Sequence, residues 1–221
     1  MPAATPLATG PAADALLGGR AVILPSPSPL TYVVAATTAR AVNEAKARPA
    51  GQEVAVWVHA ATTWTDLLPA LDLTPAAVAT AWDLLRIERV TLLVPVRPES
   101  PPPPWAAPAL RDGHLLLFGA CWPPLAVLLA RFPRLYVSSA NRTGQPPAPT
   151  AARAAAMFGP DIPVTDADHL RDNHIPHAAT TMLRITPDGA LHHIRHGAQD
   201  HAHGPDPRSY VDHLLRGHTG G

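Results

Sequence analysis

Hydroxyl and carboxamide side chains gather in one short segment, Val137 to Pro146, which reads VSSANRTGQP. It follows the apolar run RLYV and contains Ser138, Ser139, Asn141 and Thr143. Open α/β sheets bind ligands at the carboxyl ends of strands, and such side chains can donate to phosphate or carboxylate oxygens. The same residue types also form Asx and ST turns that bind nothing. The pattern indicates either a ligand-binding loop or an ordinary turn.

Two cations form the second candidate site. Lys46 and Arg48, in EAKARP, stand at the end of a helical pattern. Exposed cations at this place complement the dipole of a helix C-terminus and need no ligand. A lysine point charge and an arginine fork are also suited to clamp a phosphate group. Both interpretations stay open.

Histidines are numerous, with 12 in the chain and several in the segment LHHIRHGAQDHAHGPD. His192 and His193 face opposite sides of a strand, so they cannot bind one ion together. His201 and His203 could chelate an ion with a neighbouring aspartate. No set of ligands has the spacing of a known metal site. We therefore expect a polar loop here and no metal site.

The composition predicts one globular α/β domain. The chain has 221 residues, 47% of them hydrophobic, which is enough for one sizeable core. Lys+Arg and Asp+Glu both number 17, which argues against nucleic-acid binding by bulk charge but leaves room for a local basic groove. A single cysteine, Cys121, excludes an intrachain disulfide and a cysteine-based zinc site.

The cysteine count and the apolar runs also bear on the cellular compartment of the protein. One cysteine fits the reducing cytoplasm. No apolar run approaches the roughly 18 residues that a membrane-spanning helix needs. The amino-terminal segment lacks the basic region and the continuous apolar core of a signal peptide. We expect a cytoplasmic protein that does not contact a membrane.

Strand and helix patterns alternate along the chain, which predicts an α/β fold with a mixed sheet. We expect helices capped by Thr65 or Asp66, by Thr74 before Pro75, and by Thr150. Residues 97–109, rich in proline, are expected to be an extended surface connection. The predicted strands are 20–25, 53–59, 89–96, 113–120, 134–139, 180–186 and 190–197. The predicted helices are 13–17, 38–49, one or two within 63–87, 122–132, 150–159 and 206–217.

Taken in order, four segments resemble the YrdC family of threonylcarbamoyl-adenylate synthases. KARP before the strand VAVWV, the loop SSANRTGQP, the strand TTMLRI and the ending HHIRHGA match the family's Lys-x-Arg-Pro, Ser-Ala-Asn-x-Ser-Gly, Ser-Thr-Val and Arg-x-Gly-Ala motifs. Thr143 stands for the loop serine, and Thr180 with Thr181 for Ser-Thr. The resemblance runs from about Ala15 to Ala198.

This resemblance implies an open, twisted mixed sheet with flanking helices and a concave basic cavity. In the family, ATP, bicarbonate and threonine combine there, usually with Mg²⁺, to give threonylcarbamoyl-AMP and pyrophosphate for tRNA modification. We accordingly place a YrdC-like domain at 13–204. Composition predicts a flexible tail at 1–12, and the residue pattern predicts a C-terminal amphipathic helix and tail at 205–221.

The resemblance assigns roles to individual residues and assigns no protein ligand to a metal. Lys46 and Arg48 would be the catalytic cations and would bind the nucleotide. The further nucleotide contacts would be Ser139, Asn141, Thr181 and Arg195. The second substrate would be bound by Ser26, Thr91 and Ser138.

The sequence departs from the family pattern where the second substrate binds. Pro27 replaces an acidic residue, Leu30 a tyrosine, and Gly119 stands where an arginine is expected. Losing a buried arginine costs a few kcal/mol in carboxylate binding, so we expect altered threonine recognition. Three alternatives remain: the family reaction in a rebuilt pocket, a different amine or carbamoyl donor, or a non-catalytic protein that binds nucleotide or double-stranded RNA. We place the family reaction first.

Overall fold

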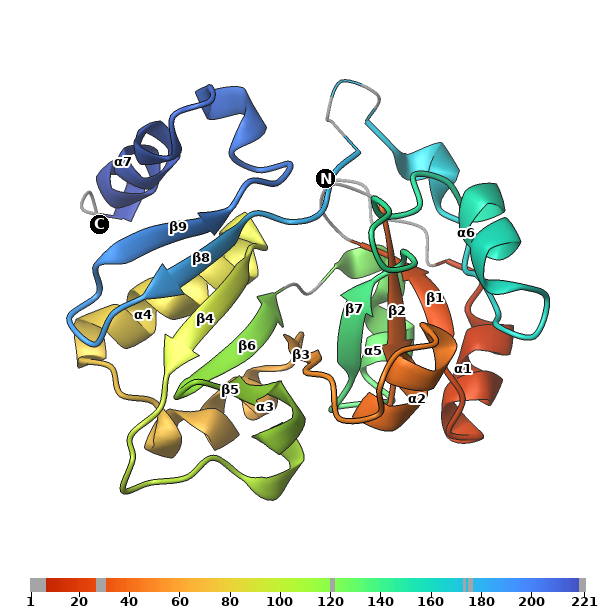
Figure 1. The fold of residues 1–221 in the computed structure, drawn as a ribbon, viewed down its shortest axis with the longest axis horizontal. Coiled ribbons are helices and arrows are strands. Elements are labelled where there is room, and N and C mark those ends of the chain that lie inside the picture. The colour runs from red at the N-terminus through yellow and green to blue at the C-terminus, as the bar shows by residue number, and fades with distance from the viewer. Residues whose placement is uncertain (1–6, 27–30, 120–121, 173, 175–176, 219–221) are drawn as a thin grey trace.

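The structure is a computed structural model that describes residues 7–26, 31–119, 122–172, 174 and 177–218. Pro27, Leu30 and Cys121 lie outside the described residues. A 9-stranded mixed sheet runs through the molecule in the order β1-β2-β7-β3-β6-β4-β8-β9, with β5 paired to β6 (Figure 1). The strands are β1 (Val22–Pro25), β2 (Tyr32–Ala36), β3 (Ala55–Val58), β4 (Thr91–Pro95), β5 (Leu110–Arg111), β6 (His114–Gly119), β7 (Tyr136–Ser139), β8 (Met182–Ile185) and β9 (Leu191–Arg195).

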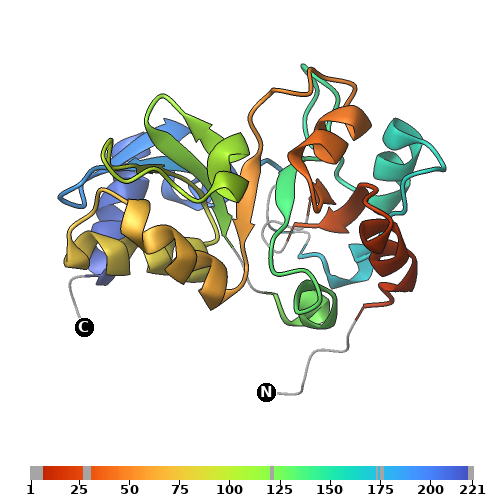
Figure 2. The same cartoon turned by 90° about the horizontal axis from the view of Figure 1, so that it is seen from below.

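Strand β3 joins two halves of this sheet. It pairs antiparallel with β7 on one side and parallel with β6 on the other. Seen from below, β3 runs between a half that contains β1, β2 and β7 and a half that contains β4, β6, β8 and β9 (Figure 2). The sheet does not close into a barrel, because β1 and β9 stand at opposite ends of the strand order and do not pair with each other. The α/β fold with an open mixed sheet is confirmed.

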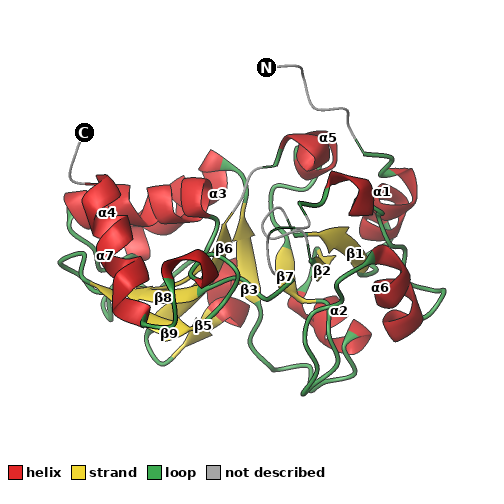
Figure 3. Cartoon of the chain, turned by 90° about the horizontal axis from the view of Figure 1, so that it is seen from above, coloured by secondary structure: helices red, strands yellow, loops and turns green. Residues whose placement is uncertain are grey.

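Two apolar cores fill the two faces of the sheet. On one face, α1 (Gly10–Leu17) and α5 (Ala126–Leu129) pack against Val22, Val33 and Trp57. On the other, buried residues of the remaining helices pack against alternate strand residues such as Val34 and Val56. These helices are α2 (Ala39–Ala45), α3 (Ala61–Leu67), α4 (Pro75–Asp83), α6 (Ala151–Phe158) and α7 (Pro207–His218), shown in red in Figure 3.

In the β6–β4–β8 half, the helices that the structure describes cover mainly one face. Leu92, Val94 and Leu117 point into the core beneath α3 and α4. Their neighbours Leu93, Leu116 and Met182 are half-buried on the other face. Side chains alternate across a strand, so this half offers a row of side chains to an open, concave surface.

Most predicted elements are present, with some corrections. The caps Thr74 and Thr150 are confirmed, since each accepts a hydrogen bond from a backbone N–H of its helix. The cap at Thr65 or Asp66 is wrong, because α3 already begins at Ala61. Helix α1 begins at Gly10, inside the range expected to be a tail. Residues Pro104–Ala109 form a 3₁₀ helix within the connection expected to be extended.

Strand β2 was not predicted. Its residues YVVAA are all buried, so they lack the alternation of a half-exposed strand. A search of the described residues finds no helix with the length and apolar character needed to cross a bilayer.

Candidate functional site

A cavity of about 170 Å³ opens on the sheet face that carries α1 and α5, beside the uncovered half. It is smaller than the roughly 300–1,000 Å³ of pockets that enclose a drug-sized ligand. A nucleotide would therefore be enclosed in part and lie otherwise on the open surface. Both halves of the sheet contribute to the lining, which includes hydroxyls, guanidinium groups and apolar side chains.

The SSAN loop, Ser138 to Asn141, begins with the last two residues of β7 and continues into the turn after it, at the edge of this cavity. Ser138 and Ser139 line the cavity. Asn141 folds back onto its own loop, because its Oδ1 accepts from Ser139 Oγ at 2.6 Å and its Nδ2 donates to Gln145 O at 2.6 Å. Gly144 has φ +80° and no neighbour within 4 Å of a Cβ at that position, so it serves the turn rather than a close approach.

Lys46 binds this loop directly. It is the C-cap of α2, and its side chain is buried. Its Nζ donates to Ser139 O, to Asn141 O at 2.7 Å and to Asn141 Oδ1 at 2.8 Å. Lys46 is not among the cavity-lining residues; its ammonium group stabilises the loop that forms the rim.

The charge state of Lys46 is finely balanced. Burial, with the positive charges of Arg48 and Arg142, lowers the pKa of Lys46 to about 7. Three acceptors around Nζ match the three N–H groups of the ammonium form and favour it. An anion in the cavity would favour the ammonium form further.

Arg48 reaches the cavity through a sharp turn after α2. Ala47 has φ 52°, a left-handed conformation that turns the chain back. Arg48 Nε donates to Asn43 Oδ1, and Arg48 Nη2 donates to Glu53 O at 3.3 Å. Burial lowers the pKa of Arg48, but a guanidinium stays charged at neutral pH. The buried Asn43 thus positions the guanidinium that lines the cavity.

The other half of the sheet brings Thr91, Thr180 and Arg195 to the cavity. Thr91 and Thr180 share a hydrogen bond of 2.6 Å between their hydroxyl groups. Arg195 Nη2 donates to Thr180 O at 3.0 Å, and burial lowers the pKa of Arg195. This side therefore has two hydroxyls and one cation.

Thr181 does not line the cavity. Because side chains alternate along β8, Thr180 and Met182 face the cavity and Thr181 faces the core. The Thr181 hydroxyl accepts from the N–H of Asp200 at 3.2 Å. The hydroxyl available to a ligand is that of Thr180.

Gly119 also faces away from the cavity. A Cβ atom at this position would lie 2.0 Å from Leu85 O, in a π-helical turn at Leu84–Glu88 that follows α4. The cavity-facing residues of β6 are Leu116 and Phe118. None of these positions supplies a cation, so this strand offers no arginine to a carboxylate.

The structure therefore brings six of the nine predicted site residues to one cavity and leaves three elsewhere. Six line it: Ser26, Arg48, Thr91, Ser138, Ser139 and Arg195. Lys46 and Asn141 hold the loop at its rim, and Thr181 lies in the core. Their roles toward a ligand stay predictions.

Sequence reasoning missed two residues that position the site. Arg142 Nη1 donates to Ala45 O at 3.0 Å and Nη2 to Met157 O at 3.2 Å, so it ties the loop to α2 and α6. Asn43 holds Arg48. The available signal for Asn43 was a carboxamide on the apolar side of a helical pattern.

Comparison with known proteins identifies the fold. No family model and no curated protein matches the sequence at the required significance. Among solved structures, P. abyssi Sua5 complexed with L-threonine superposes with a TM-score of 0.63 and 19% identity over 84% of this chain and 53% of Sua5. Full-length HypF in the phosphate- and nucleotide-bound form superposes with a TM-score of 0.63 and 18% identity, over 89% of this chain and 29% of HypF.

A third structure, E. coli YciO, superposes with a TM-score of 0.59 and 12% identity over 85% of this chain and 87% of YciO. The chain spans about half the length of the Sua5 structures that it matches. The fold is YrdC-like, as the sequence motifs predict.

Proposed function

We propose that the protein activates a nucleotide: it forms a carbamoyl adenylate from ATP and bicarbonate and releases pyrophosphate. The observation that carries this proposal is the convergence of Arg48 and Arg195, from the two halves of the sheet, on one cavity that hydroxyl side chains also line. Paired guanidinium groups with hydroxyl donors suit phosphate oxygens. The YrdC-like fold supports the proposal, and one solved relative of that fold, HypF, was seen in a nucleotide-bound form.

The proposed chemistry needs no protein nucleophile. An amine first condenses with bicarbonate, which forms the C–N bond of a carbamate and releases water. A carbamate oxygen then attacks the α-phosphorus of ATP. The bond from that phosphorus to the bridging oxygen breaks, and pyrophosphate leaves. Catalysis consists of positioning and charge stabilisation, which Arg48 and Arg195 would supply at the phosphoryl oxygens. Lys46 would keep the SSAN loop in the shape that receives the nucleotide.

Mg²⁺ would accompany the triphosphate. Glu53 is the single carboxylate among the described cavity-lining residues. Mg²⁺ is commonly held by one or two carboxylates together with substrate phosphates and water, so Glu53 fits this need. The ion would neutralise charge on the phosphates.

The side of the cavity formed by β6, β4 and β8 indicates which amine would be the substrate. Threonine is the first candidate, and the product would then serve N6-threonylcarbamoyl modification of tRNA adenosine. A different small amine is the second candidate, because Leu116, Phe118 and Met182 give this wall an apolar surface. A carboxylate there would lose water without gaining a guanidinium partner from β6.

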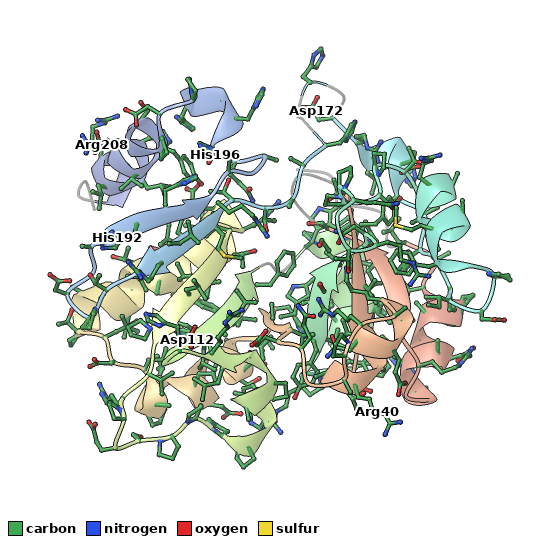
Figure 4. The ribbon with its side chains drawn as sticks, in the orientation of Figure 1. Arg40, Asp112, Asp172, His192, His196 and Arg208 are labelled. Atoms are coloured by element: carbon green, nitrogen blue, oxygen red, sulfur yellow. The ribbon has the colours of Figure 1, made fainter. Side chains whose placement is uncertain are left out.

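The test is pyrophosphate release from ATP, Mg²⁺ and bicarbonate, with threonine or with a panel of other small amines. ATP affinity is measured alongside by calorimetry in Arg48→Met and Arg195→Met. The matched control is Arg208→Met, which removes an exposed arginine of α7 (Figure 4). Each cavity variant should weaken ATP binding about tenfold or more, the scale of a lost charge-assisted hydrogen bond, and the control should not.

The outcomes separate the alternatives. Release that depends on threonine supports the family reaction, and release with another amine supports a changed acceptor. ATP binding without release from any amine indicates a non-catalytic nucleotide-binding protein. ATP affinity that is equal in wild type and both cavity variants contradicts this site. RNA binding that falls steeply with salt while ATP has no effect would indicate a nucleic-acid-binding protein instead.

A further inference from the structure

Three side chains near the end of the sheet converge on one point. His193 lies on β9, His196 follows that strand, and Asp200 precedes a short 3₁₀ helix at His201–His203. His193 Nε2 and His196 Nδ1 both contact Asp200 Oδ2, the latter at 3.0 Å. The three potential ligand atoms all lie within 4.8 Å of one another. We propose that His193, His196 and Asp200 bind a divalent transition metal such as Zn²⁺.

The chemistry of this set suits that class of ion. Imidazole nitrogen and carboxylate oxygen bind zinc at about 2.0–2.2 Å, and three protein ligands with one open position are a common arrangement. The two imidazole rings are tilted by 52° with centroids 4.5 Å apart, so both rings lie beside the same carboxylate. Hard cations such as Mg²⁺ and Ca²⁺ prefer oxygen ligands, so the two histidines disfavour them.

The backbone orients the carboxylate for this role. Asp200 Oδ1 accepts from the N–H of Gly197 at 3.0 Å, which leaves Oδ2 to the histidines. The N–H of Asp200 donates to the hydroxyl of Thr181 in turn. Hydrogen bonds of this kind around a metal site fix the orientation of the ligands.

Two of these three side chains are buried, and the third is exposed to solvent. The side chains of His193 and Asp200 are 8% and 3% exposed, whereas that of His196 is 58% exposed. An ion held here would keep a coordination position toward solvent, in a surface hollow that His201 also lines. The expectation that this segment has no metal site considered His192 with His193, and His201 with His203. The fold instead aims His193 and His196 at Asp200.

Such an ion would link two segments of the C-terminal region. It would join the end of β9 to the segment that leads into α7, which packs against β9 through Tyr210 and Leu214. Arg195, between the two histidines in sequence, lines the cavity. The metal ion would therefore bridge these two segments beside the cavity and would not lie inside it.

The test uses the full chain and Zn²⁺ alone, by calorimetry at neutral pH. The variant is His196→Ala, chosen because the exposed side chain can be removed without opening the core. The matched control is His192→Ala, an exposed histidine at the other end of β9 (Figure 4). We expect one tightly bound Zn²⁺ per chain, an affinity at least about tenfold lower in His196→Ala, and no change in His192→Ala.

A second measurement separates the site from adventitious binding by the other histidines. Zn²⁺ should raise the thermal unfolding midpoint of wild type and His192→Ala but not that of His196→Ala, since only specific binding to the folded state stabilises it. Equal affinity in His196→Ala and wild type, an equal loss in both variants, or no binding by the wild type would overturn the proposal. Nucleotide binding plays no part in either measurement, so the result is independent of the proposed function.

Discussion

On the β1–β2–β7 side of the cavity, a ligand would meet the serines of the SSAN loop and the nearby guanidinium of Arg48. On the β6–β4–β8 side it would meet Leu116, Phe118 and Met182, with Thr91, Thr180 and Arg195 further along the wall. The first wall, called the loop wall, is the end of β7 together with the loop that follows it, and a buried lysine holds this loop in shape. The second wall consists of side chains on regular strands.

The difference between the two walls of the cavity has a physical basis. Phosphate groups can be bound by backbone and hydroxyl groups in a loop, and such a loop has a recognisable sequence of small polar residues. The strand wall can change its polarity by single substitutions without altering the backbone. The loop wall therefore keeps the motif, whereas the second wall, called the strand wall, would select the second substrate of the proposed reaction.

The largest expected effect concerns Gly119, behind the strand wall. Gly119→Ala should lower the free energy of unfolding by about 3 kcal/mol, because the added Cβ would meet Leu85 O and force the backbone apart. Urea unfolding followed by circular dichroism measures this. Gly51→Ala is the control, since nothing lies within 4 Å of a Cβ there. Equal stability of both variants would mean that the wall can yield enough to accept a side chain at 119.

A medium effect is expected at the loop wall. Burial and neighbouring cations lower the pKa of Lys46 to about 7, and a bound triphosphate would raise it by favouring the ammonium form. Binding then takes up a proton between these two pKa values. ATP affinity should fall as the pH rises above 7, by about tenfold over the next one to two units.

Calorimetry across that pH range checks the prediction, with Lys46→Arg as the comparison. A guanidinium stays protonated throughout, so the variant should lose this dependence on pH. The same pH dependence in both proteins would assign the titration to another group and weaken the role of Lys46 in the loop wall.

The smallest expected effect distinguishes two adjacent threonines just before β8. Thr180→Val removes a cavity hydroxyl and leaves the hydroxyl of Thr91 without this partner, at a cost of about 1 kcal/mol in stability. ATP affinity should fall by roughly threefold if the hydroxyl meets the ligand. Thr181→Val should leave ATP affinity unchanged, because that side chain lies in the core. The reverse order of effects on affinity would support the sequence-based assignment of Thr181.

Local chemistry explains which features could be predicted from the sequence. The caps Thr74 and Thr150 follow from residue types next to their helices, and the hairpin of β8 and β9 follows from a turn at Pro187–Gly189. The proximity of Arg48 and Arg195 was expected through the family resemblance. Their separation by 147 positions (195 − 48) shows why spacing alone could not have paired them.

Features that depend on which face a residue occupies were predicted less well. Thr181 and Gly119 were assigned to the cavity, but the register of β8 and β6 turns both toward the core. A shift of one residue reverses the face of a strand, and a motif match does not fix that face. The meeting of His193, His196 and Asp200 depends on the turn after β9, for which the sequence had no distinctive spacing.

The pairing of β3 with its two neighbours is short, which affects how the two halves of the sheet are joined. On one side, β3 meets β7 through the pairs Ala55↔Val137 and Val56↔Tyr136, and on the other it meets β6 through Val56, Trp57 and Val58. Both apolar cores continue across this seam, so side-chain packing adds to the few strand pairs in holding the halves together. Arg48 and Arg195 reach the cavity from opposite sides of β3, so the distance between the two guanidinium groups depends on the angle at which the halves meet.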